Sequence, residues 1–218
     1  MSDPMEVLVR LREQARADAK LSSERSVETT THDLPDVRRL VSAMPGRRAH
    51  RFFGSADIHE TWVQDARRLF FDVDAALYPH EAGAHPLSLL VFARRVHGIE
   101  PAVYETTGGS LARRALMDSV SLRDVVLQPE FAESAAILVA MGSFATEHSN
   151  AHAHRRLLSR AGSGLEAVWL SAVAAGLSGS IFAGFLPSAL AQLGIANGYD
   201  RLQLLALAVG SPLSTDRQ

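Results

Sequence analysis

Three arginines lie within five positions of one another, directly after a predicted helix end, in the segment Gly46-Arg47-Arg48-Ala49-His50-Arg51-Phe52-Phe53. Guanidinium groups this close repel one another unless an anion or carboxylates lie among them. Arginine binds phosphate well because its planar side chain presents paired N–H donors. The spacing therefore indicates a phosphate-binding cluster, and a solvated basic turn is the alternative that the segment alone leaves open.

A second segment, from Arg160 to Gly179, is rich in Gly, Ala and Ser. A helix of such small residues packs closely against another backbone or against a flat ligand. A central core helix would have the same composition, so this stretch alone assigns no function.

Composition excludes several classes of protein. The chain has 218 residues, a formal net charge of −2, 47% hydrophobic residues and no Cys. This size predicts one domain with an extension, and the apolar content excludes a disordered chain. The lack of Cys excludes a disulfide scaffold, thiol catalysis and thiolate metal sites. The near-neutral charge gives no argument for nucleic acid. No apolar run predicts a membrane span or a signal core, so we expect a cytoplasmic protein that binds no membrane.

Helical and strand patterns alternate along the chain with irregular connections, which favours an α+β domain. Residues 1–33 are predicted to form an N-terminal helix and a linker, and residues 34–218 the domain itself. Predicted helices cover 33–44, 57–71, 121–127, 152–176 and 187–193. Predicted strands cover 87–96, 101–104, 135–141, 180–185 and 202–209, and 79–85 is predicted to be a loop.

Several segments carry a resemblance to a known family when they are taken in order. They are Arg-Arg-x-x-Arg-x-Phe at 47–53, Pro79 through Gly83 to His85-Pro86-Leu87, Val96-x-Gly98-Ile99-x-Pro101-x-Val103-Tyr104, Ala161-Gly162, Ala175-Gly176-Leu177-Ser178, Ala183-Gly184-Phe185 and Leu207-Ala208-Val209-Gly210-Ser211-Pro212. Over residues 40–212 the chain resembles flavin-dependent nitroreductase-fold proteins. Within that group it is most similar to the azoline dehydrogenases, which oxidise thiazoline and oxazoline rings in peptides.

The resemblance implies a nitroreductase-like fold with a central, mainly antiparallel sheet flanked by helices. It also implies a homodimer that binds FMN at the subunit interface, with both chains building each site. By position, the FMN phosphate would be held by Arg47, Arg48 and Arg51. Residues beside the flavin ring would include Pro79, His80 and Gly83, and backbone near the ring nitrogens would come from Ala183 and Gly184. Small residues suit backbone that approaches a flat ring.

The sequence departs from the family pattern at four places. Ala49 stands where the family has Ser, His80 follows Pro79 where it has Ser, and Glu166-Ala167 replaces Gln-Asn. The Lys-Tyr pair that precedes the long helix in azoline dehydrogenases is also missing. His148 and Ser149 lie near its place.

Azoline oxidation needs a base that removes a carbon-bound proton, and histidine titrates near neutral pH. We therefore predict His148 or His152 as the catalytic base. These histidines are alternatively polar residues of a loop and helix start. Their spacing of four also permits metal binding, but no carboxylate set completes a site, so no metal is predicted.

Three functions remain open from the sequence. The favoured one is an FMN-dependent oxidoreductase that converts azoline rings to azoles in a peptide-derived natural product. The alternatives are an NAD(P)H-dependent nitro- or quinone reductase, and a catalytically degenerate scaffold subunit of a biosynthetic complex. The expected partners are a second copy of the chain, a peptide or small-molecule substrate and other biosynthetic enzymes.

Overall fold

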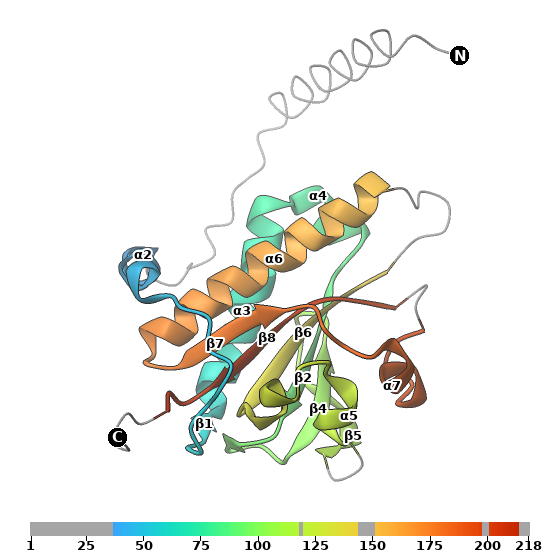
Figure 1. Cartoon of the computed structure of the whole chain (residues 1–218). Coiled ribbons are helices and arrows are strands. Elements are labelled where there is room, and N and C mark those ends of the chain that lie inside the picture. Colours follow the sequence, from blue (N-terminus) through green and yellow to red (C-terminus); the bar gives the residue numbers. More distant parts are fainter. Residues whose placement is uncertain (1–36, 118–119, 144–150, 198–200, 214–218) are drawn as a thin grey trace, which may run out of the picture. The chain divides into compact units, whose positions relative to one another are not determined.

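The computed structural model describes residues 37–117, 120–143, 151–197 and 201–213 (Figure 1). The predicted N-terminal extension, residues 1–33, lies outside these residues. The described chain begins with α2 (Val37–Ala43), which leads into a short 3-10 turn at Met44–Gly46. Pro45 and Gly46 therefore end this helix as predicted.

Six strands form one sheet: β2 (Ser88–Ala93), β4 (Ala102–Thr106), β5 (Ala112–Leu116), β6 (Ala136–Gly142), β7 (Ser178–Phe182) and β8 (Leu202–Gly210). Their order is β5-β4-β2-β6-β8-β7, and every neighbouring pair is antiparallel. The predicted antiparallel α+β architecture is thus confirmed. A separate parallel pair joins β1 (Ile58–His59) to β3 (Val96–His97).

Both faces of this sheet are covered, because its central strands carry apolar residues on each side. All seven residues of β6 are buried. Along β2, Leu89 and Val91 belong to one hydrophobic cluster, whereas Leu90 and Phe92 belong to another. This alternation follows from the two-residue repeat of a strand, so the two clusters lie on opposite faces.

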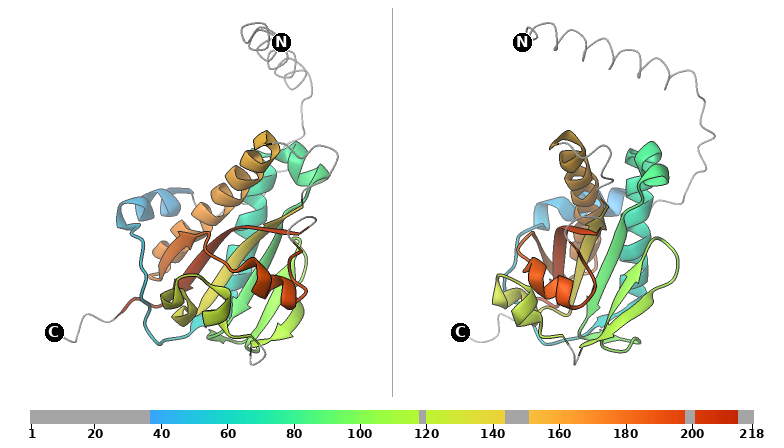
Figure 2. Two further views of the ribbon diagram at one scale, coloured as in Figure 1. Left: turned by 45° about the vertical axis from the view of Figure 1, so that its right-hand side comes forward. Right: turned by 90° about the vertical axis from the view of Figure 1, so that its right-hand side faces the viewer.

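The long helices α3 (Glu60–Leu77) and α6 (Ala151–Ala174) pack side by side on one face (Figures 1 and 2). Gly164 permits their close approach, since a Cβ there would lie 2.6 Å from Cδ2 of Phe70. The small residues of α6 are therefore explained by core packing. After the helix, Gly176 adopts φ +76°, as a glycine C-cap predicts.

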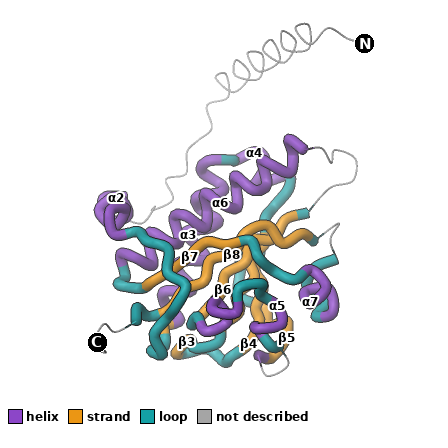
Figure 3. Tube along the Cα trace, viewed as in Figure 1, coloured by secondary structure: helices purple, strands orange, loops and turns teal. Residues whose placement is uncertain are grey.

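Short helices cover the other face of the sheet (Figure 3). They are α5 (Leu122–Val125), a 3-10 helix at Pro129–Glu133 and α7 (Pro187–Gln192). They contribute Val125, Phe131 and Leu190 to the second hydrophobic cluster. A stacked pair, Phe131 and Phe182, joins the 3-10 helix to β7 at a centroid distance of 4.4 Å.

Two local predictions are wrong. The predicted loop at 79–85 is instead a helix, α4 (Pro79–Ala84), which Pro79 can begin because a first-turn residue needs no N–H partner. Asp57 does not cap α3, because Ile58 and His59 pair with β3 first. The cap is His59, whose Nδ1 accepts a hydrogen bond from the Thr61 amide at 3.2 Å.

A buried ion pair joins the two long helices. Arg160 donates from Nε and Nη2 to the two carboxylate oxygens of Asp74, at 2.8 and 2.7 Å. Its Nη1 donates to the backbone oxygen of His85 at 3.0 Å. The two side chains are only 2% and 3% exposed. Each charge in this contact therefore has a partner inside the protein. Removing one side chain would leave the other as a buried charge without a partner.

A second buried carboxylate, Glu105, lies on β4. It accepts hydrogen bonds from Arg201 at 2.5 Å, Arg114 at 2.7 Å and the Ser88 hydroxyl at 3.1 Å. Burial by itself would raise the pKa of Glu105, but the hydrogen bonds and attraction of Arg201 and Arg114 outweigh it, and the pKa is lowered. The ionised side chain thus stabilises the folded protein.

Asp74→Ala is expected to lower the free energy of unfolding by about 3–5 kcal/mol, because it leaves a buried guanidinium without its carboxylate. The double variant Asp74→Leu/Arg160→Met should recover most of this loss. Urea denaturation measures both. Asp65→Ala is the control, since its pair with Arg68 is exposed and worth at most about 1 kcal/mol. Equal losses in Asp74→Ala and Asp65→Ala would contradict the role of the buried pair.

Glu105→Gln is expected to destabilise the protein at pH 7 by about 1–3 kcal/mol, because charge-assisted hydrogen bonds are lost. The lowered pKa makes this contribution fully present above about 4.5, the usual value, and lost as the pH falls through the folded value. Urea denaturation from pH 7 to pH 3 should therefore show wild type and variant converging. A constant difference would contradict this, and Glu100→Gln, in an exposed pair with Arg113, is the control.

Candidate functional site

The arginine segment is fixed to the sheet by its backbone. Ala49 forms a parallel bridge with Gly179 at β7, and the His50 amide donates to the Gly179 oxygen at 3.1 Å. Farther along, the Gly54 amide donates to the Ser211 oxygen at 2.8 Å, just beyond β8. The segment therefore runs along β7 and the end of β8, and hydrogen bonds hold its backbone in place. Its arginine side chains are exposed.

Arg47 lies against the middle of α6. Its Nη1 donates to Oε2 of Glu166 at 3.2 Å, and its guanidinium carbon lies 4.8 Å from the centroid of the Trp169 ring. The side chains of Arg47 and Glu166 remain 40% and 38% exposed. Arg47 is thus positioned by a carboxylate and an aromatic face, and it still has N–H groups open to solvent.

The other two arginines are more loosely held. Arg51 approaches Glu130 at 3.8 Å, and its side chain is 72% exposed. Arg48 is exposed and makes no ion pair with any carboxylate that the structure describes. The cluster therefore holds three guanidiniums against two carboxylates, and its excess positive charge and planar donors suit a phosphate group.

Ala183 and Gly184 follow β7 on the same flank. The Leu127 amide donates to the Gly184 oxygen at 2.8 Å, and a Cβ on Gly184 would lie 2.5 Å from Oε1 of Gln128. Gly184 thus packs closely against the residues before the 3-10 helix. Glu130, the partner of Arg51, lies in that helix. Gly184 and Arg51 therefore both contact the short stretch 127–130.

Pro79, His80 and Gly83 lie elsewhere, on exposed α4. Glu81 of α4 forms an ion pair with Arg156, and Arg160 bonds to the His85 oxygen, so α4 packs on the first half of α6. Glu166 and Trp169 hold Arg47 about ten residues farther along that helix. At about 1.5 Å per residue this separates the two groups by about 15 Å.

Of the two predicted catalytic bases, His152 lies near α4. His152 is exposed in the first turn of α6. It precedes Arg156 by one turn, so it lies on the helix side that contacts α4. His148 lies outside the described residues. Within the described residues no group of three or more His, Asp or Glu side chains could hold a metal ion, and no helix is long and apolar enough to cross a membrane.

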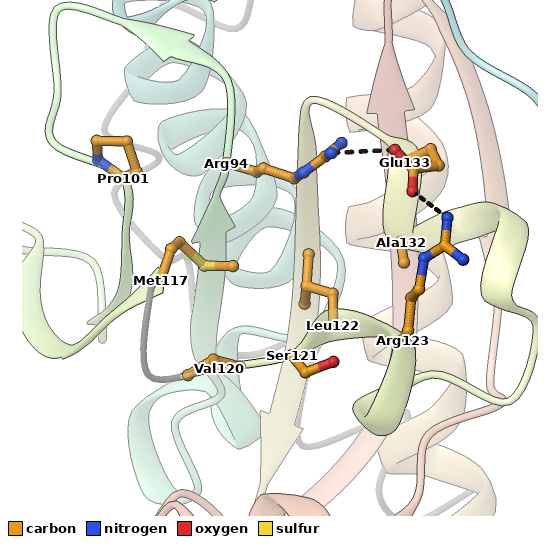
Figure 4. A pocket seen from close by; sticks show the side chains of 9 residues that line it. All are labelled: Arg94, Pro101, Met117, Val120, Ser121, Leu122, Arg123, Ala132 and Glu133. Carbon is orange, nitrogen blue, oxygen red and sulfur yellow. Dashed lines mark hydrogen bonds and ion pairs between the residues drawn. The ribbon is translucent and has the colours of Figure 1, made fainter.

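Sequence reasoning missed a charged cavity at the ends of β2, β4 and β5, beside α5 and the 3-10 helix (Figure 4). Arg94 and Arg123 both point at Glu133, with distances of 3.0 and 2.7 Å, and the cavity of about 390 Å³ is otherwise mostly apolar. The hydrogen bond from Arg123 lowers the pKa of Glu133, burial opposes it, and Arg94 adds to the lowering. Nothing local in the sequence shows that a carboxylate 39 residues away meets Arg94.

A neighbouring cavity of about 520 Å³ begins where the arginine segment ends. Its lining includes Phe52, Phe53, Pro129 and Leu213, together with charged residues around Glu130. Phe52 is 63% exposed, which is unusual for a large aromatic side chain. Two adjacent phenylalanines after three arginines were the available sequence signal for an apolar surface beside the cationic cluster.

Comparison with known proteins identifies the fold. Neither a family model nor a curated protein matches the sequence. Among solved structures, a protein of Anabaena variabilis assigned as a nitroreductase matches with a TM-score of 0.66 and 18% identity, over 79% of this chain. This chain spans only 38% of that protein's length.

Two further solved structures match over most of their own length. One, from Ralstonia eutropha and assigned as a nitroreductase, has a TM-score of 0.59 and 18% identity, covering 86% of this chain and 88% of the other. Another, from Desulfovibrio desulfuricans, is assigned as a nitroreductase in complex with FMN. It has a TM-score of 0.54 and 15% identity, covering 82% and 91%. With its six-stranded antiparallel sheet flanked by helices, the chain has the nitroreductase fold.

Proposed function

We propose that this chain is an FMN-dependent oxidoreductase whose favoured reaction is the oxidation of azoline rings to azoles in a peptide-derived substrate. One observation carries the proposal: three arginines stand on a backbone pinned to β7 within a nitroreductase fold. A solved structure of that fold is an FMN complex. FMN offers the two features that this flank can bind, a phosphate dianion and a flat ring.

The residues present fit the phosphate. Arg48 has no described carboxylate partner, and Arg47 and Arg51 keep exposed guanidinium groups despite Glu166 and Glu130. Arginine donates two parallel hydrogen bonds to phosphate, so these three side chains can bind it together. Ala183 and Gly184 would bring backbone close to the ring, as their small size permits.

We extend the proposal to a homodimer, which the resemblance of the sequence implies. In one copy, Arg47 and the helix α4 meet α6 at places about 15 Å apart. A second copy would place its α4 beside the ring held by the first copy's arginines. On this proposal each site takes its phosphate ligands from one chain and residues of α4 from the other.

Oxidation of an azoline removes two hydrogens from the ring, one as a proton and one as a hydride. We assign removal of the proton to His152 or His148, because an imidazole nitrogen can act as a general base near neutral pH. Bound FMN would supply the hydride acceptor, with dioxygen as the terminal oxidant. His152 is exposed in the first turn of α6, beside α4, where a peptide can approach from solvent.

A second candidate is an NAD(P)H-dependent nitro- or quinone reductase, which needs no protein base. The assignment of the three structures named above as nitroreductases favours it. A third is a scaffold subunit that binds no flavin, which the pairing of Arg47 with Glu166 favours. These three functions differ in flavin content and in the electron donor.

Arg47→Ala/Arg51→Ala is expected to weaken FMN binding at least tenfold, because two phosphate ligands are lost, while riboflavin affinity changes little. Quenching of flavin fluorescence measures both affinities. Arg68→Ala removes an exposed arginine on α3 and serves as the control. Unchanged FMN affinity in the double variant would refute the phosphate assignment.

Anaerobic mixing separates the two enzymatic candidates. An azoline-containing peptide is expected to bleach the flavin absorbance of the FMN-loaded protein, and NADPH alone is not. His148→Ala/His152→Ala should slow bleaching by about 10²–10⁴-fold without changing flavin content, because the proton acceptor is removed. Fast bleaching by NADPH alone would favour the reductase, and full turnover in the double histidine variant would place the base elsewhere.

A further inference from the structure

Arg47 is the most constrained of the three arginines, because two residues of α6 hold its side chain. Glu166 and Trp169 are three positions apart and thus share one side of the helix. Glu166 accepts a hydrogen bond from the guanidinium at 3.2 Å, and the Trp169 ring lies beneath it at 4.8 Å. Arg47 therefore has an anionic partner within the chain itself.

The backbone of β7 connects the arginine segment to α6. Gly179 packs against Trp169, since a Cβ on it would lie 2.9 Å from Cδ1 and 3.0 Å from Nε1 of the indole. The same glycine pairs with Ala49 and accepts from the His50 amide. These contacts of β7 thus set the distance between the arginine segment and α6.

Charge at the cluster is therefore lower than the three arginines suggest. Glu166 and Glu130 lie beside Arg47 and Arg51, which leaves a formal excess of one positive charge. The Arg47–Glu166 contact is half exposed, so its rupture costs little. The Glu166 side chain starts from the core helix, so its carboxylate stays within one side-chain length of this position. Any phosphate that takes a hydrogen bond from Arg47 must lie close to this second anion.

We propose that Glu166 is a built-in competitor of the flavin phosphate for Arg47. This inference rests on the proposed function and concerns the strength and selectivity of the same site. Glu166 weakens FMN binding by like-charge repulsion and reduces the preference for FMN over riboflavin, which has no phosphate. The site thus binds FMN less tightly than it would without this carboxylate.

Glu166→Gln isolates the charge, because the amide oxygen can still accept the hydrogen bond from Arg47. Repulsion between unit charges several ångströms apart near a protein surface corresponds to about three- to tenfold in affinity. We expect FMN to bind Glu166→Gln about three- to tenfold more tightly than wild type, with riboflavin affinity unchanged. The matched control is Glu100→Gln, which removes a carboxylate from the exposed pair with Arg113, and neither affinity should change.

The experiment titrates flavin-stripped full-length protein with FMN and with riboflavin, and follows quenching of flavin fluorescence at low ionic strength. Weaker or unchanged FMN binding in Glu166→Gln would overturn the inference, and weaker binding would identify Glu166 as a positioning residue for Arg47. An equal gain for riboflavin would also overturn it. If wild type and both variants all fail to bind FMN, the proposed function itself fails. Binding by wild type with no gain in Glu166→Gln refutes the inference alone.

Discussion

The backbone pairing between the arginine segment and β7 determines where the three arginines lie. Gly179 serves three contacts at once: it bridges Ala49, accepts from the His50 amide and packs against the edge of Trp169. These contacts join the edge of the sheet, the core helix and the cationic cluster in one place. The arginines therefore do not form a loose basic tail, because their Cα positions are set by the same hydrogen bonds that complete the fold.

The helix α6 relates this cluster to the rest of the molecule. Its first half carries His152, Arg156 and the buried Arg160, which together face α4, and its middle carries Glu166 and Trp169, which face Arg47. Its small residues allow α3 to pack closely, as Gly164 against Phe70 shows. One helix thus separates the group of charged residues that faces α4 from the pair that contacts Arg47. The arginine segment and α4 therefore contact different parts of the same helix.

The architecture was largely predictable from local patterns. Buried strands such as β2 and β6 are short apolar runs, and the ends of α2 and α6 carry Pro45 and Gly176 where helix-ending residues belong. Edge strand β5 escaped prediction because its exposed Arg113 and Arg114 mask the strand pattern. Helix α4 was not predicted, because Pro and Gly are typical of loops. Pro79 is nevertheless compatible with a helix, since it occupies the first turn.

For the candidate site, the sequence indicated the three arginines but not the carboxylates that pair with two of them. Glu166 lies 119 positions from Arg47, so only the folded chain shows that a carboxylate neutralises a predicted phosphate ligand. The most direct test of the central claim is a crystal structure of the protein grown with FMN. We predict that the phosphate lies within hydrogen-bond distance of Arg47, Arg48 and Arg51 of one copy, with the ring beside α4 of a second copy. A phosphate bound away from this segment, or crystals that contain no flavin at saturating FMN, would contradict the account.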